Sequence, residues 1–121
     1  DRDAKNNDGW TALICASKGG HESCVRALLE AGADKDAKNK YGRTALMNAS
    51  AGGHEPCVRA LIEAGADKDA KDNGRTALMS ASEGGHASCV RALLEAGADK
   101  DAKDNDGGTA LLFASDLSLS E

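Results

Sequence analysis

Aromatic side chains are scarce in this sequence of 121 residues, which contains one Trp, one Tyr and one Phe. Any hydrophobic core must therefore be built from Leu, Ala, Val, Ile and Cys, whose size suits closely packed helices. The length allows one domain and is too short for two well-buried ones.

Two further absences exclude two classes of partner. No apolar run approaches the roughly 20 residues that span a bilayer, so we expect no membrane partner. Fifteen basic residues against twenty acidic ones give a net charge of -5, which favours solubility and repels a phosphate backbone. We therefore expect no nucleic-acid partner.

What the sequence does contain is a repeat of about 33 residues. Residues 25–38 recur unchanged at 90–103, and they recur at 58–71 with Ile62 as the only change. One Thr per repeat recurs at intervals of 33, 32 and 33, at Thr11, Thr44, Thr76 and Thr109. We expect a single domain of three full units, at about residues 3–35, 36–68 and 69–100, and a partial unit at 101–121.

Each full unit predicts two helices. In the first unit Thr11 is a good N-cap for a short helix over residues 12–18, and the Gly-Gly pair that follows ends this helix. A second helix is expected over residues 22–31, and Gly32 ends it. Pro56 falls in the first turn of the corresponding helix of the second unit, where it breaks no helical hydrogen bond.

The second helix of each unit has one apolar face that a single unit cannot bury. In the first unit this face consists of Cys24, Val25, Leu28 and Leu29. Neighbouring units must stack to cover it, which makes the molecule elongated. The polar stretches before and between the units are typical of tight loops or hairpins. The third hairpin of the chain, which precedes Thr76, is one residue shorter than the second, which predicts a tight turn at Asn73-Gly74.

These segments resemble the ankyrin-repeat family. The resemblance is carried by Gly-x-Thr-x-Leu, Gly-His and Gly-Ala-Asp, which stand in the first unit at residues 9–13, 20–21 and 32–34 and recur at a fixed spacing along the chain. It implies an all-α solenoid of stacked antiparallel helix pairs with projecting β-hairpin loops. It also implies a non-catalytic scaffold that binds another protein.

The sequence departs from the family pattern at three places. Ala replaces the family's Pro after each capping Thr, and an apolar residue replaces its His at Ile14, Met47, Met79 and Leu112. These changes weaken the entry into the first helix but keep its Thr cap. The partial unit has no Gly-His, because residues 116–121 read Asp-Leu-Ser-Leu-Ser-Glu.

The histidines at His21, His54 and His86 do not predict a metal site. Equivalent positions on stacked helices lie roughly 8–10 Å apart, whereas zinc ligands must each come within about 2.1 Å of one ion. We expect each His to open its second helix and to hydrogen-bond the backbone of a neighbouring loop. No cofactor is predicted.

The same spacing excludes disulfides among Cys24, Cys57 and Cys89, which we expect to be buried core residues. Cys15 has no partner in register and is expected to be the only accessible thiol. Four free thiols favour a reducing compartment, cytosolic or nuclear. None stands beside a base and an acid in a pattern for nucleophilic catalysis, so we expect no enzyme.

The charged residues of the repeat predict solvated, balanced surfaces rather than sites. In each linking loop Asp alternates with Lys, as in Asp34-Lys35-Asp36. On the second helices, Arg26, Arg59 and Arg91 are expected to pair with the glutamates four residues further on, Glu30, Glu63 and Glu95.

Candidate binding residues are those that break the repeat. They lie at the expected hairpin tips and on the first helices, the surfaces that line the partner groove in the family the chain resembles. Trp, Tyr and Arg are also the types enriched in binding hot spots. The predicted partner-binding residues are Asn7, Trp10, Lys18, Lys40, Tyr41, Arg43, Arg75 and Asp106.

A second function is open at this stage. The identity of fourteen residues across units is typical of recent duplication or of deliberate design, and units without polar capping repeats would expose apolar helix faces. The chain is then a designed or self-associating scaffold without a cognate ligand, which assembles through its ends.

Overall fold

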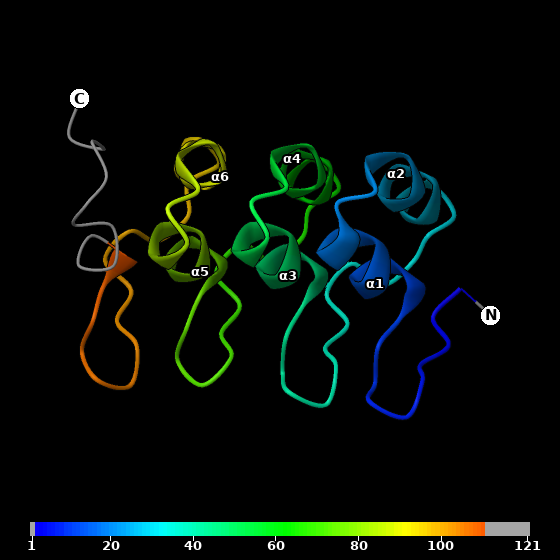
Figure 1. Cartoon of the computed structure of the whole chain (residues 1–121), viewed down its shortest axis with the longest axis horizontal. Coiled ribbons are helices and arrows are strands. Elements are labelled where there is room, and N and C mark those ends of the chain that lie inside the picture. Colours follow the sequence, from blue (N-terminus) through cyan, green and yellow to red (C-terminus); the bar gives the residue numbers. More distant parts are fainter. Residues whose placement is uncertain (1, 111–121) are drawn as a thin grey trace.

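The computed structural model describes residues 2–110, which form three helix pairs in a row (Figure 1). The first helices of the pairs lie side by side, and the second helices form a parallel layer above them. The hairpin loops all project on the side of the first helices. The helices are α1 (Ala12–Gly19), α2 (Glu22–Glu30), α3 (Ala45–Ala51), α4 (Glu55–Glu63), α5 (Ala77–Glu83) and α6 (Ala87–Glu95). This arrangement confirms the predicted all-α stack.

Threonine caps begin the first helix of each pair, as the sequence predicts. The hydroxyl oxygens of Thr11, Thr44 and Thr76 accept hydrogen bonds from backbone N–H groups three residues further on, at 3.1 to 3.3 Å. In α3 the Met47 sulfur also accepts from the Thr44 N–H at 3.5 Å. The caps therefore remain although the family's Pro and His are replaced.

The second helices begin beside histidines, and Pro56 stands in the first turn of α4 as predicted. The His54 ring contacts the Lys18 carbonyl oxygen through Nε2 at 3.0 Å, and the His86 ring contacts that of Ala51 at 3.1 Å. Each ring thus links its unit to the last turn of the preceding first helix. The predicted backbone contact is present for these two histidines, but its partner is the end of a first helix rather than a loop. His21 has no preceding first helix to contact among residues 2–110.

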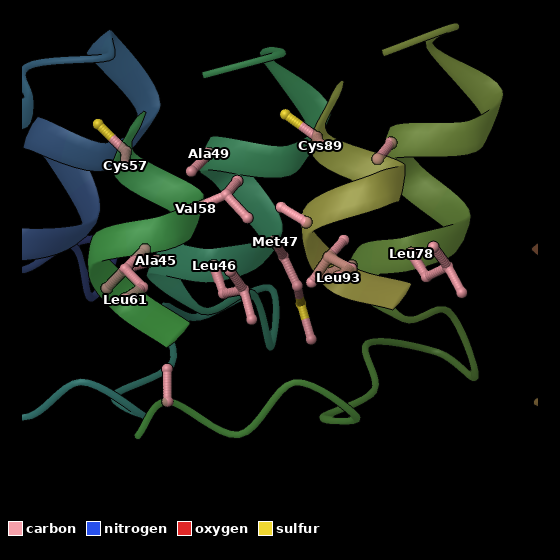
Figure 2. Packing of buried hydrophobic residues seen from close by; sticks show 14 of the residues in the cluster. Ala45, Leu46, Met47, Ala49, Cys57, Val58, Leu61, Leu78, Cys89 and Leu93 are labelled. Carbon is pink, nitrogen blue, oxygen red and sulfur yellow. The ribbon is translucent and has the colours of Figure 1, made fainter. Parts of the chain in front are cut away.

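The core is continuous from unit to unit. Figure 2 shows Leu46 of α3 and Leu61 of α4 in the same packed layer as Leu78 and Leu93 of the next pair. All four side chains are at most 2% exposed. Because no single pair could bury these residues, stacking supplies most of the hydrophobic stabilisation.

The aspartates of the linking loops do more than balance charge. The Asp36 carboxylate accepts the Asp67 N–H at 2.8 Å, and Asp69 accepts the Asp99 N–H at the same distance. Asp3 does the same for Asp34. Asp36 and Asp69 are solvent-exposed, as predicted, but their carboxylates also hold successive loops in register.

The short third hairpin has the predicted tight turn. Asp72 and Arg75 exchange both backbone hydrogen bonds at 2.9 Å. The two residues between them, Asn73 and Gly74, have φ values of +52° and +84°. Positive φ at both central positions is the geometry that favours Asn-Gly in two-residue hairpins.

Two expectations for the second helices are wrong. Cys24 is exposed, whereas Cys57 and Cys89 are buried, because a preceding unit covers this position only in α4 and α6. Cys15 is therefore not the only accessible thiol. For the same reason Val25 is the only member of the predicted α2 face that is fully buried.

The arginine pairing also differs from the prediction. Arg26 contacts Glu22 at 2.8 Å and Glu63 at 3.1 Å, rather than Glu30. Arg59 likewise contacts the glutamate four residues before it and Glu95 of the next unit. The last glutamates of α4 and α6 thus form ion pairs with the arginine of the preceding unit. Arg91 has no ion pair of this kind within residues 2–110.

Some expectations concern residues 111–121, which lie outside the described part of the chain. They include the apolar replacement at Leu112 and the altered Gly-His segment at 116–121. Thr109 and Ala110 are the last residues described.

Candidate partner-binding face

The hairpins that precede the first two helix pairs are closed by an Asn side chain. The Asn6 Oδ1 atom accepts backbone N–H groups of Asp8 and Trp10 at 2.9 and 3.0 Å. Asn39 does the same for Tyr41 and Arg43. The aromatic residues of both hairpins are therefore carried on a fixed backbone, which lowers the entropy lost when a partner binds.

Trp10 and Lys18 are brought together at the start of the array. The Lys18 Nζ atom lies 5.0 Å from the centroid of the Trp10 ring, within the range of a cation–π contact. Trp10 is half-buried and packs against the core, whereas Lys18 is exposed in the last turn of α1. These two predicted residues thus form one contact surface.

Lys40 and Tyr41 form a second pair on the next hairpin. The Lys40 Nζ atom lies 5.2 Å from the centroid of the Tyr41 ring and 2.7 Å from the Asp8 carboxylate. The hydrogen bond to Asp8 raises the pKa of Lys40 above its usual value. Tyr41 is 56% exposed, more than any other large apolar side chain among residues 2–110.

Arg43 and Arg75 are engaged within the molecule. Arg43 lies 3.7 Å from Asp72 of the following hairpin, and Arg75 lies 3.2 Å from Glu83 and 3.9 Å from Asp104. Both side chains are about one-third exposed. They connect hairpins to one another and offer a partner only part of their surface.

The two remaining predicted residues are exposed at the outer hairpins. Asn7 lies in the first turn and Asp106 in the fourth. The Asp106 N–H donates to the Asp104 carboxylate at 2.9 Å. The predicted residues therefore spread over all four hairpins, and only Trp10, Lys18, Lys40 and Tyr41 form close pairs with a ring.

A hollow of about 460 Å³ lies beside Trp10, between the first hairpin and α1. Trp10 and Lys18 line it together with four residues absent from the predicted set, of which Asp8 and Cys15 carry reactive or charged side chains. The sequence marks both as positions that break the repeat, but the pairing of Asp8 with Lys40 depends on how the hairpins stack. Within residues 2–110 no group of His, Cys, Asp and Glu side chains is arranged to hold a metal ion.

The four thiols fall into two classes. Cys15 and Cys24 are exposed, and Cys57 and Cys89 are buried. Burial raises the pKa of Cys57, and it raises that of Cys89 from about 9 to about 11. Because the thiolate is the nucleophile, the two buried thiols are less reactive.

We expect thiol labelling at pH 8 to show two fast and two slow cysteines. A pKa shift from about 9 to about 11 lowers the thiolate fraction of Cys89 about a hundredfold, and burial slows access further. Mass spectrometry after a short reaction should find label on Cys15 and Cys24 alone. In denaturant all four should react alike, and rapid labelling of Cys89 in the folded chain would contradict the described burial.

The comparisons with known proteins agree with this architecture. A family model described as ankyrin repeats, in three copies, matches residues 1–72 and again residues 69–120. The chain therefore belongs to the ankyrin-repeat family, whose members are in general protein-interaction modules and typically non-catalytic. A search of the curated proteins found no match. None of the helices among residues 2–110 has the length and apolar character needed to cross a membrane.

Proposed function

We propose that this chain is a non-catalytic scaffold that binds a partner protein through its hairpin tips and first helices. The observation that carries the proposal is the pair of aromatic side chains, Trp10 and Tyr41, on adjacent hairpins with rigid backbones. Each has a lysine ammonium within about 5 Å of its ring. Aromatic anchors held in place before binding are typical of interaction hot spots.

The proposal is tested by affinity capture with the wild-type chain and with Trp10→Ala and Tyr41→Ala variants. We expect at least one substitution to weaken binding of the captured partner by about 2 kcal/mol or more, roughly thirtyfold. Circular dichroism controls for folding, because Trp10 also packs against the core. Unchanged affinity in both folded variants would contradict the proposed face.

Self-association is a second candidate, as in a designed or consensus-like scaffold with no cognate ligand. It is favoured by the exposure of Cys24 and of Leu94, which is 40% exposed at the opposite end of the described array. Glu30 and Arg91 also occupy the two positions that would continue the ion pairs between units. A second copy could join these ends.

Light scattering over a concentration series tests this second candidate. Association through the ends predicts a mass that rises with concentration, and a Leu94→Glu substitution should suppress the rise because it places a charge on the apolar contact. A monomer mass at every concentration would remove the candidate and leave the partner-binding proposal intact.

A reducing compartment, cytosol or nucleus, is proposed for the chain. Support comes from its four cysteines, all of which are free. Disulfides are rare in such compartments, and free thiols persist there.

A further inference from the structure

The hollow beside Trp10 keeps a net positive charge, whereas the hollow beside α6 is lined by one Lys and one Asp, Lys100 and Asp101. The hollows between second helices are lined by Arg26 with Glu63 and by Arg59 with Glu95, which already pair with each other. In the hollow beside Trp10, Asp8 is neutralised by Lys40 at 2.7 Å. Lys18 has no ion pair within the described part of the chain. The hollow therefore retains one positive charge on a chain whose net charge is -5.

The position of Lys18 suits a ligand that combines a negative charge with an apolar group. The Lys18 ammonium lies 5.0 Å from the centroid of the Trp10 ring. An ammonium has three N–H donors, and a carboxylate accepts hydrogen bonds from them better than the face of a ring does. The Trp10 backbone N–H donates to the Asn6 Oδ1 atom at 3.0 Å, which holds the backbone that carries the ring. The half-buried ring forms an apolar wall of the hollow. A carboxylate at Lys18 would thus stand next to an apolar side chain at Trp10.

The rest of the face limits how acidic the ligand can be. On the fourth hairpin Arg75 neutralises Asp104 at 3.9 Å, but Asp106 has no ion pair among residues 2–110, so an anion beside Asp106 meets repulsion. A phosphate group is also disfavoured at the hollow. Phosphate recognition commonly uses an arginine fork, and Arg75 and Arg43 already contact carboxylates.

We propose that the hollow beside Trp10 binds a Glu or Asp side chain of the partner, flanked by an apolar residue that packs on the Trp10 ring. The partner's acidic residue contacts the first two units of the chain. The part of the partner that covers Asp104 and Asp106 is neutral or basic. This inference rests on the proposed function, because it names the chemistry of the partner at the same face.

The probe is a library of random twelve-residue peptides displayed on phage and selected on the folded chain. We expect enriched peptides to share an acidic residue next to an apolar one. Lys18→Glu should weaken their binding about tenfold or more, and Lys18→Arg should largely retain it. Arg91→Glu is the matched control, because it makes the same charge change on an exposed residue of α6.

The most specific test exchanges the two charges between the peptide and position 18 of the chain. Replacing the acidic residue of an enriched peptide by Lys should abolish binding to the wild-type chain and restore it to the Lys18→Glu variant. Enriched peptides without an acidic residue, or binding that is indifferent to Lys18→Glu, would overturn the inference. If Trp10→Ala or Tyr41→Ala still abolishes that binding, the proposed function stands. If Lys18→Glu, Trp10→Ala and Tyr41→Ala all leave binding unchanged, both proposals fail.

Discussion

Leu61→Ala is expected to lower the free energy of unfolding by about 2–5 kcal/mol, the range for a leucine removed from a packed core. Leu61 is 0% exposed, because it lies in α4 with packed units on both sides. A domain of this size has a total stability of about 5–15 kcal/mol, so the loss is a large share of it. Urea unfolding followed by circular dichroism measures the change.

Leu28→Ala is the matched control, since Leu28 occupies the same position in α2. It is only partly buried, because the described chain has no helix pair before it. We expect a clearly smaller loss, about 1–2 kcal/mol. Equal losses at the two positions would contradict the conclusion that stacking between units provides most of the burial.

Gly20→Ala is expected to cost about 2–3 kcal/mol, although it adds a single methyl group. Gly20 has a φ of +75°, which costs an alanine about 1 kcal/mol. The new Cβ atom would also lie 2.5 Å from the His54 Nδ1 atom. The ring must move and lose its 3.0 Å contact with the Lys18 carbonyl oxygen, which adds about 1 kcal/mol or more.

Gly107→Ala separates the two parts of this cost. Its φ is +83°, but no atom lies within 4 Å of the new Cβ position, so only the backbone strain of about 1 kcal/mol is expected. Combining Gly20→Ala with His54→Ala should cost less than the sum of the single changes. Additive losses would show that the ring and the glycine do not depend on each other.

The features that were predictable from the sequence are those set within one unit. Thr11 caps a helix through a group three residues away, and Asn73-Gly74 forms a turn through its own φ angles. These caps and turns depend only on nearby residues, so units with the same sequence are predicted to have the same local structure. The helix boundaries accordingly fall within about one residue of the expected ones.

The features that were not predictable depend on contacts with the adjacent unit. Cys24 and Cys57 have the same local sequence position, yet only Cys57 is covered by a preceding helix pair. Arg26 reaches Glu63 of the next unit rather than Glu30 of its own helix, a contact that depends on how the units stack. The contact between Lys40 and Asp8 likewise joins two hairpins and has no signature in either alone.

The most direct test of the proposed binding face is hydrogen exchange on the chain alone and with a partner captured through it. We predict slower exchange of backbone amides over residues 6–18 and 39–48, where Trp10, Lys18 and Tyr41 lie, and little change in α4 and α6. Protection confined to the second helices α2, α4 and α6 would contradict this prediction and place the partner on the opposite side of the array.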